Sequence, residues 1–346
     1  MASVDVAIPC YNYARYLEPC VRSVLDQRGV DVRVLIIDDQ SPDNTPEVAK
    51  GLTDADPRVS YTRNERNLGL IGTANRGIIE WARADYCMTL SADDALAPGA
   101  LARAAAVMDA DPAIGMTYGM ARIFSEALPT VEDDLTFEHR VISGTDLIRH
   151  SCEIGNPAPS PTVVTRTALQ HVIGGYSPNL PHTSDMEMWM RFALHGPAAA
   201  IKSVQGFYRW HGGNMTTLHL DGPLIDRRHR LDACRQTFTK HGGEDAPGFR
   251  QWLDEMVERF AKDGNWMAGE AYAMGDMELY RRCRAFAAEC DPRFAGESVS
   301  LRHRLKRLLG ARLSHKLKPV PAWFDLNAST TQWFEETEQF GWWPET

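Results

Sequence analysis

The chain has 346 residues, of which 44% are hydrophobic and 24% charged, so it is long enough to bury a large core and is expected to fold. Its net charge is −9 without a basic excess, which argues against nucleic acid as the main partner. No apolar run reaches 18 residues and the N-terminus lacks a signal-peptide pattern, so we expect a cytoplasmic protein that does not span a membrane. The seven scattered cysteines, without a Cys-x-x-Cys pair, indicate reduced thiols and no structural zinc site.

The first part of the chain alternates between apolar runs and helical patterns. The strand-like runs cover residues 4–9, 32–37, 59–62 and 86–90. A helical stripe follows the first run, a second helix is expected near Pro46, and a third from Thr73 to Ala84. Strands that alternate with helices through short loops are typical of a parallel sheet with right-handed crossovers. The pattern therefore predicts an α/β fold.

Adjacent acids follow two of these apolar runs. They are Asp38-Asp39 and Asp93-Asp94. Because aspartate is depleted in strands, we place both pairs just past the carboxyl ends of their strands, where open α/β sheets bind ligands. Carboxylates at such an edge suit Mg²⁺ or Mn²⁺ together with the oxygens of a substrate phosphate. Taken alone, the pairs could equally be solvated aspartates in loops.

Four motifs in order resemble the nucleotide-sugar-binding half of the inverting family 2 glycosyltransferases. They read Val-Ala-Ile-Pro-x-Tyr-Asn at 6–12, Leu-Ile-Ile-Asp-Asp-x-Ser-x-Asp-x-Thr at 35–45, Asn-x-Gly with Asn-Arg-Gly at 67–77, and Ser-Ala-Asp-Asp at 91–94. The resemblance implies the GT-A fold, a Rossmann-like and mostly parallel sheet flanked by helices. It also implies a nucleotide-sugar donor and Mn²⁺ or Mg²⁺ as the cofactor.

The resemblance also implies roles for the matching residues of the donor pocket. Pro9 and Tyr11 would line the pocket for the base, with Tyr11 stacking on it. Asp39 would hydrogen-bond the base, and Asn67 and Arg76 would lie near the nucleoside or the phosphates.

The same resemblance divides the second acidic pair between two ligands. Asp93 would hold the ribose and Asp94 the metal on the diphosphate. Many members of the family carry Asp-x-Asp-Asp here, whereas this chain has Ser91 at the first acidic position. This departure leaves about one carboxylate for the metal and weakens the expected dependence on a metal.

The expected acceptor half begins with a helix at 95–111 and a strand at 115–120, and contains a proline-rich loop at 156–161. Ser184 is expected to cap the next helix, which places Asp185 in its first turn, either as part of the cap or facing a cleft. The segment 174–191 resembles the Gly-Gly-Phe/Tyr … Glu-Asp-x-x-Leu-Trp-x-Arg motif of the same family. That match implies that Asp185 is the catalytic base. The fallback, Glu187, would point about 200° away on the helix.

The segment 207–216 resembles the Tyr-Arg-x-His-x-x-Asn-x-Ser/Thr motif that closes the catalytic domain in many members. His211 would then ligate the metal or contact the diphosphate, although a lone histidine is often structural. We therefore expect a catalytic domain at 1–218, with a nucleotide-sugar half at 1–95 and an acceptor half at 96–218, followed by a helical region at 219–346.

The helical region is expected to turn at 241–243 and at 263–264. A basic amphipathic segment at 301–318 predicts either peripheral contact with the inner face of a membrane or packing of its leucines on the catalytic domain. The acidic, aromatic tail at 319–346 is expected to dock on the protein or on a partner.

We interpret the sequence as an inverting glycosyltransferase that moves a sugar from a nucleoside diphosphate, with uridine diphosphate as the expected carrier, to a hydroxyl of a glycan or lipid-linked glycan. A nucleotide-sugar sensor without turnover is the alternative, favoured by the shortened acidic motif. A nucleotidyltransferase is a further alternative, but the chain lacks the glycine-rich basic signature of that class near its N-terminus. The sugar, the acceptor and the oligomeric state are left open.

Overall fold

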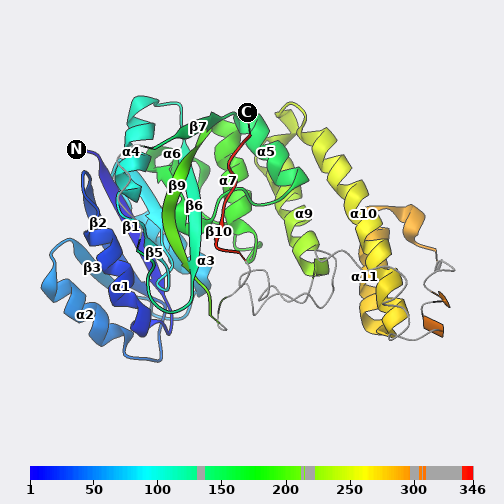
Figure 1. The fold of residues 1–346 in the computed structure, drawn as a ribbon, viewed down its shortest axis with the longest axis horizontal. Coiled ribbons are helices and arrows are strands. Elements are labelled where there is room, and N and C mark those ends of the chain that lie inside the picture. Colours follow the sequence, from blue (N-terminus) through cyan, green and yellow to red (C-terminus); the bar gives the residue numbers. More distant parts are fainter. Residues whose placement is uncertain are drawn as a thin grey trace.

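The computed structural model describes residues 1–130, 137–211, 214, 223–296, 304–305, 307–308 and 337–345. Among these residues, strands are β1 Ser3–Cys10, β2 Asp31–Asp38, β3 Val59–Arg63, β4 Tyr86–Thr89, β5 Ala95–Leu96, β6 Met116–Phe124, β7 His139–Ile142, β8 Val164–Arg166, β9 Ala198–Arg209 and β10 Gln339–Phe340. They form one sheet in the order β3-β2-β1-β4-β8-β6-β9-β5, with β10 beside β6 and β7 beside β9. Helices cover this sheet (Figure 1), which confirms the predicted α/β class.

The helices are numbered in chain order. They are α1 Ala14–Leu25, α2 Thr45–Ala55, α3 Gly69–Asn75, α4 Ala100–Ala110, α5 Gly144–Glu153, α6 Thr167–Ile173, α7 Ser184–His195, α9 Pro223–Lys240, α10 Phe249–Met274 and α11 Met277–Cys290. A π-helical turn, η1 Arg76–Trp81, continues α3, and short 3₁₀ turns are η2 Ser160–Thr162, η3 Gly243–Asp245 and η4 Pro292–Phe294.

The N-terminal half of the sheet is parallel. β1 pairs with β2 and β4, and β2 pairs with β3, all in parallel register. Their apolar side chains are buried between the helices, which is why these runs lack the alternation of a half-exposed strand. Cys10 is level with Asp38, and Ala7 with Thr89, so the acids that follow β2 and β4 lie at the same edge.

The second half of the sheet mixes strand directions. β8 is antiparallel to both β4 and β6, whereas β9 is parallel to β6. The two short strands β5 and β7 are antiparallel to β9. β5 immediately follows Asp94 in the chain, so its pairing with β9 brings the end of β9 to the acidic pair.

Three helix boundaries differ from the prediction. The helix expected at 73–84 begins earlier, at Gly69, and widens into η1, whose Gly77 lies so close to β1 that an added Cβ would be 2.3 Å from the Cβ of Ala7. The helix expected at 95–111 begins at Ala100, because pairing with β9 makes a strand of Ala95–Leu96 despite the helix propensity of alanine. The turn expected at 263–264 is wrong. α10 continues through Gly264, whose lack of a side chain lets α11 approach: a Cβ there would be 3.0 Å from Phe286 Cδ1.

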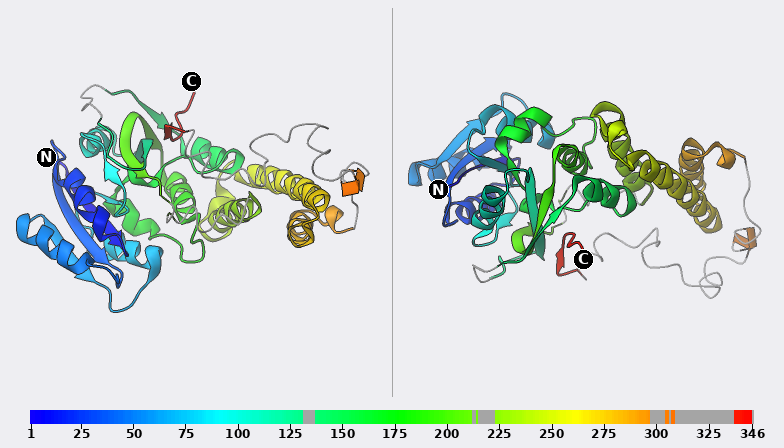
Figure 2. Two further views of the ribbon diagram at one scale, coloured as in Figure 1. Left: turned by 60° about the horizontal axis from the view of Figure 1, so that its bottom comes forward. Right: turned by 90° about the horizontal axis from the view of Figure 1, so that it is seen from above.

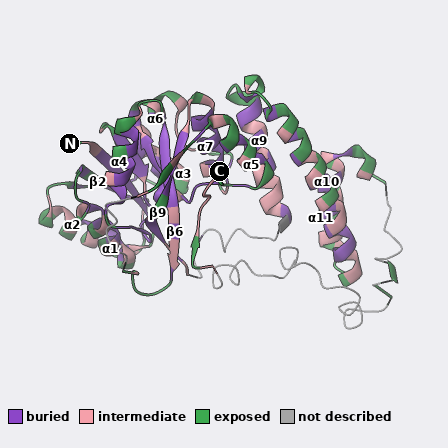
Figure 3. Cartoon of the chain, turned by 45° about the horizontal axis from the view of Figure 1, so that its top comes forward, coloured by how far each residue is buried: buried purple, intermediate pink, exposed green. Residues whose placement is uncertain are grey.

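The C-terminal helices are continuous with the body that carries the sheet. Buried residues of α5 and α7, such as Leu147 and Trp189, belong to the same apolar cluster as Leu231, Phe249 and Phe286 of α9 to α11. Figure 2 shows α10 and α11 extending away from the strands of the N-terminal half, and Figure 3 shows that buried and exposed residues alternate along both helices. The predicted boundary after residue 218 lies outside the described residues.

Two further expectations concern the surface. No helix in the described ranges is long and apolar enough to cross a membrane. Apart from residues 304–305 and 307–308, the basic segment 301–318 lies outside the described residues, so its two interpretations remain predictions.

The cysteines agree with the expectation of reduced thiols. All seven are free thiols.

Candidate active site

A cavity of about 600 Å³ opens at the carboxyl ends of β1, β2 and β4. Seven of the predicted site residues line it: Pro9, Tyr11, Asp39, Asn67, Asp93, Asp94 and Asp185. The other two lie behind this lining. Arg76 donates to Asn64, which in turn donates to Asp39, and His211 bonds to Asp93. The structure therefore brings the two halves of the predicted site together.

Tyr11 and Asp39, which the resemblance assigned to the base, both line the cavity. Tyr11 is 49% exposed although it is a large aromatic side chain. Asp39 is buried, and its Oδ1 accepts hydrogen bonds from Asn64 Nδ2 and Leu68 N, both at 2.7 Å. No described residue donates a hydrogen bond to its Oδ2. An exposed ring beside a fixed carboxylate is suited to a flat heterocycle that presents an N–H group.

The loops at this edge turn through left-handed residues that are not glycine. Asn12, just after β1, has φ of 59°, and Gln40, just after β2, has φ of 62°. The Asn12 backbone N–H donates to Ser41 Oγ at 3.1 Å, which ties the two loops together. Such conformations are costly outside glycine and are concentrated at functional sites.

The acidic pair Asp93 and Asp94 is buried and fixed by the end of β9. Arg209 N donates to Asp94 Oδ1 and Arg209 Nε to the Asp93 carbonyl, each at 2.9 Å. Burial, and then the negative charge of Asp93, raise the pKa of the Asp94 carboxyl. Two adjacent buried carboxylates thus stand at the cavity wall with one arginine to balance them, an arrangement that favours the binding of a cation.

His211 is held beside Asp93 and not beside Asp94. Its Nε2 lies 3.0 Å from Asp93 Oδ2, and its ring stacks on Tyr16 with centroids 5.5 Å apart. Its backbone N–H donates to Asn214 Oδ1 at 2.6 Å. As placed, His211 orients the carboxylate assigned to the ribose. Its predicted role as a metal ligand would require Nε2 to leave Asp93.

The carboxylates of the cavity decide how a divalent metal could be held. Within the described ranges, no group of three or more His, Cys, Asp or Glu side chains could hold a metal ion. Asp94 nevertheless fits the usual mode of Mg²⁺, which takes one or two carboxylates and completes its shell with water and substrate phosphate. The residues present therefore fit a metal that arrives with the diphosphate.

Asp185 enters the cavity from the first turn of α7. Its Oδ2 accepts hydrogen bonds from Asn156 Nδ2 at 2.8 Å and Ser160 Oγ at 3.0 Å. Burial raises the pKa of this carboxyl, an effect partly offset by these donors. The expected N-cap is wrong by one residue: Thr183 precedes the helix, and its hydroxyl donates to the carbonyl of His229. Asp185 Oδ1 accepts the backbone N–H of Met186 in the first turn of α7 at 2.7 Å, and the side chain also lines the cavity.

Comparison with known proteins identifies the family. The sequence model of glycosyl transferase family 2 matches residues 5–172. The succinoglycan biosynthesis protein ExoO of Rhizobium meliloti (strain 1021) is 33% identical over 278 residues, which cover 74% of this chain and 78% of that protein. This chain belongs to glycosyl transferase family 2. It is a glycosyltransferase, as the resemblance predicted.

Two further likenesses place this glycosyltransferase among its relatives. The chondroitin synthase of Pasteurella multocida (strain Pm70) is 26% identical over 218 residues, 63% of this chain, and this chain spans 22% of that enzyme's length. The crystal structure of S. aureus TarS 1–349 in complex with UDP-GlcNAc aligns with a TM-score of 0.59 at 14% identity, covering 91% of this chain and 90% of that chain. The second likeness shows a shared fold and confirms the GT-A prediction.

Other residues of the second family motif in this glycosyltransferase are structural. Glu187 is fully buried, and its carboxylate receives Nε and Nη2 of Arg191, each at 2.9 Å. Arg191 also donates to the carbonyls of Ile173 and Gly175 at 2.6 Å. Glu187 thus faces away from the cavity, as the helical offset predicted. Together with Arg191 it fixes the loop before α7.

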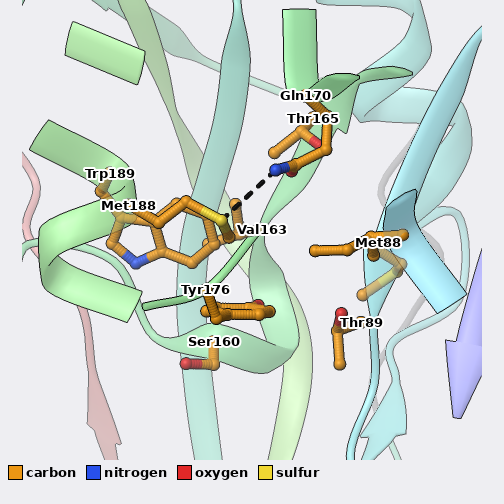
Figure 4. Close-up of a pocket in the computed structure, with 10 residues that line it drawn as sticks. Met88, Thr89, Ser160, Val163, Thr165, Gln170, Tyr176, Met188 and Trp189 are labelled. Atoms are coloured by element: carbon orange, nitrogen blue, oxygen red, sulfur yellow. Dashed lines mark hydrogen bonds between the residues drawn. The ribbon is translucent and has the colours of Figure 1, made fainter. Parts of the chain in front are cut away.

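The wall behind Asp185 is a packed apolar layer. Tyr176, Met188 and Trp189 lie on one side of a small cavity of about 10 Å³, with Met88 and Thr89 of β4 on the other (Figure 4). Ser160 lines both this cavity and the large one. This layer joins α7 to β4, so it sets the position of Asp185 relative to the acids that follow β4.

The sequence analysis missed several residues of the site in this glycosyltransferase. They are Cys10, Tyr13, Asn156, Ser160, Tyr208, Asn214 and Phe340, all of which line the cavity. Asn156 and Ser160 lie in the proline-rich loop that the sequence analysis assigned to the acceptor half, but their bonds to Asp185 were not foreseen. Nothing in the sequence indicated that Phe340 belongs to the site, because it lies in the tail that was expected only to dock on the protein or a partner.

Proposed function

We propose that this family 2 glycosyltransferase is an inverting enzyme that uses a uridine diphosphate sugar and a hydroxyl acceptor on a glycan or lipid-linked glycan. One observation carries the proposal: the half-buried carboxylate of Asp185 and the paired carboxylates Asp93 and Asp94 line the same cavity from opposite halves of the fold. Such an arrangement suits one group that accepts a proton and another that holds a charged leaving group.

The donor would bind at the carboxyl edge of the parallel strands. Tyr11 would stack on the uracil, Pro9 would pack beside it, and Asp39 would accept the base N–H through Oδ2. Asp93, oriented by His211, would hold the ribose hydroxyls. The exposed ring of Tyr11 and the buried, hydrogen-bonded carboxylate of Asp39 support this assignment.

Asp94 would hold Mn²⁺ or Mg²⁺ in contact with the diphosphate. When bound, the metal would supply positive charge that stabilises the departing diphosphate. Asn67 lines the same cavity and would lie near the nucleoside or phosphates. Arg76 would act through Asn64 and Asp39, to which it is linked by hydrogen bonds.

Asp185 would act as the general base in a single displacement. Its carboxylate takes the proton of the acceptor hydroxyl as the acceptor oxygen forms its bond to the anomeric carbon. The bond from that carbon to the diphosphate oxygen breaks, and its electron pair leaves with the diphosphate. The raised pKa makes the ionised carboxylate a stronger base, while Asn156 and Ser160 keep it directed at the cavity.

The test begins by finding the donor. A thermal-shift panel of uridine, guanosine and adenosine diphosphate sugars, with and without Mn²⁺, identifies the sugar that raises the unfolding midpoint. Release of nucleoside diphosphate is then measured with and without acceptor glycosides. An Asp185→Asn variant should keep the donor-induced shift and lose about 100-fold or more of the transfer rate. Asp54→Asn, which alters an exposed aspartate paired with Lys50 on α2, is the matched control.

Two outcomes would contradict the proposal. Full transfer by the Asp185→Asn variant would exclude this residue as the base. A donor that raises the midpoint of the wild-type protein without any release of nucleoside diphosphate would favour the sensor without turnover.

A further inference from the structure

The C-terminal strap, residues 337–345, returns from the far end of the chain to the body that holds the cavity (Figure 1). Its strand β10 is antiparallel to β6, with Gln339 level with Arg122 and Phe340 with Ala121. Ile123 N also donates to the Glu338 carbonyl at 2.9 Å. β8 pairs with β6 only as far as Thr117, so the strap takes the next stretch of the same strand. The strap is thus an added strand of the catalytic sheet.

Two tryptophans hold the strap. The ring of Trp342 stacks on His150 with centroids 3.9 Å apart, and its backbone N–H donates to the Pro157 carbonyl at 2.9 Å. Trp343 lies under two cations, 4.7 Å from Arg140 and 5.3 Å from Lys202. The tail was expected to dock, and its described part does. Its point of attachment, Pro157, adjoins the asparagine that bonds the proposed base.

Gly341 lets the strap pass close to the sheet. It has φ of +136°, a conformation that other residues rarely adopt, and a Cβ there would lie 2.8 Å from the Gly119 carbonyl oxygen of β6. The atom that a side chain at this position would meet first is therefore backbone, which cannot move aside as the end of a side chain can. Substitution of Gly341 is therefore a way to loosen the strap without changing its aromatic residues.

Phe340 is the strap residue that lines the cavity. Its ring lies square to that of Tyr208, with an interplanar angle of 86° and centroids 5.6 Å apart. Asn156, Ser160 and Asp185 line the same cavity. Its neighbour Gln339 is exposed, as expected for the opposite face of a strand. Phe340 thus presents an aromatic surface within the cavity that contains the proposed base.

We propose that Phe340 is an acceptor-binding residue whose ring packs against the apolar C–H face of the acceptor sugar. Carbohydrates combine such a face with hydroxyl groups, and the site offers both an aromatic surface and polar groups that can bind hydroxyls. The acceptor class is therefore a pyranoside. This inference rests on the proposed function, because it takes Asp185 as the group that receives the acceptor hydroxyl.

The test uses the full chain, saturating uridine diphosphate, and the p-nitrophenyl β-glycosides of glucose, galactose, N-acetylglucosamine and N-acetylgalactosamine as probes. Binding is followed by saturation-transfer NMR. We expect at least one glycoside to bind the wild-type protein and Phe340→Ala to raise its Kd about tenfold, which corresponds to about 1.4 kcal/mol. Phe340→Tyr should restore binding, and Gln339→Ala should leave it unchanged.

A second variant separates the strap from a local effect of Phe340. Gly341→Ala should weaken glycoside binding as Phe340→Ala does, and should speed amide hydrogen exchange in residues 337–345. Both variants should keep the affinity for uridine diphosphate, which shows that the rest of the site is folded.

Three results would overturn the inference. The first is an unchanged glycoside affinity in Phe340→Ala, and the second is that no glycoside in the panel binds. The third is faster transfer in Gly341→Ala, which would mean that the strap blocks the cavity. Failure of the proposed function is distinct, because it would appear as a wild-type protein that releases no nucleoside diphosphate from any donor.

Discussion

The two sides of the cavity are assembled in different ways. The side that we propose for the donor comes from the first 94 residues, where parallel strands end at a common edge and their loops carry Tyr11, Asp39 and the acidic pair. The side that we propose for the acceptor collects a loop at 156–161, the first turn of α7, the end of β9 and the C-terminal strap. The donor side is thus a local product of repeated strand–helix units, whereas the acceptor side depends on contacts between distant segments. Substitutions on the two sides should therefore affect different measured quantities.

The largest effect among the donor-side variants is expected from Asp94→Asn. The amide can still accept the bond from Arg209 N, but it removes the charge that would hold a metal. We expect transfer to fall about 100-fold and the Mn²⁺ concentration for half-maximal rate to rise. Initial rates across a Mn²⁺ titration measure both. An unchanged Mn²⁺ dependence would contradict the role assigned to Asp94.

Tyr11→Ala should act on the nucleotide alone. Stacking of a base on an aromatic ring contributes about 1–3 kcal/mol, so the Kd for uridine diphosphate should rise at least about fivefold. Calorimetric titration gives the Kd directly. The affinity for acceptor glycosides should stay the same, and an equal loss of both affinities would mean that the two sides are not separable.

His211→Gln should have a smaller effect that also decides between two roles. If His211 orients Asp93, the glutamine amide can still donate to that carboxylate and only part of the hydrogen bond is lost, so the Kd for the donor should rise by no more than about tenfold, with the Mn²⁺ requirement unchanged. If His211 is a metal ligand, the Mn²⁺ concentration for half-maximal rate should rise in His211→Gln as it does in Asp94→Asn. The same titration thus separates the two roles.

The smallest expected effect is on stability. Burial raises the pKa of Asp185 in the folded protein, so the ionised carboxylate lowers the free energy of unfolding above that pKa. Asp185→Asn should therefore raise the unfolding midpoint by a few degrees at pH 8. The difference should shrink as the pH falls through the folded pKa, because the wild-type residue is then protonated. A lower midpoint at pH 8 would show that Asp185 has a stabilising role.

The same contrast explains how much the sequence could predict. The runs that became β1, β2 and β4 end in turns and acids, so strand periodicity and motif spacing placed Tyr11, Asp39 and the acidic pair at one edge of the sheet, where the structure has them. The wide turn after Arg76 and the short strand at Ala95–Leu96 were missed, because packing against Ala7 and pairing with β9 override local propensity. Such contacts between distant segments cannot be predicted from the local sequence.

On the acceptor side, the prediction rested on resemblance more than on pattern. Asp185 alone could have been part of a helix cap, and only the fold shows that it receives donors from Asn156 and Ser160. Phe340 could not have been found, since nothing in a docked tail indicates which ring reaches the cavity. Its place there follows from the pairing of β10 with β6.

The pH dependence of kcat for transfer, measured side by side on the wild-type protein and Asp185→Asn, tests the central claim most directly. A carboxylate base must be ionised to act, so the wild-type rate should fall on the acid side with an apparent pKa above the ordinary value for aspartate. Asp185→Asn should give a low rate without this acidic limb. An identical acidic limb in the two proteins would contradict the assignment of Asp185 as the base.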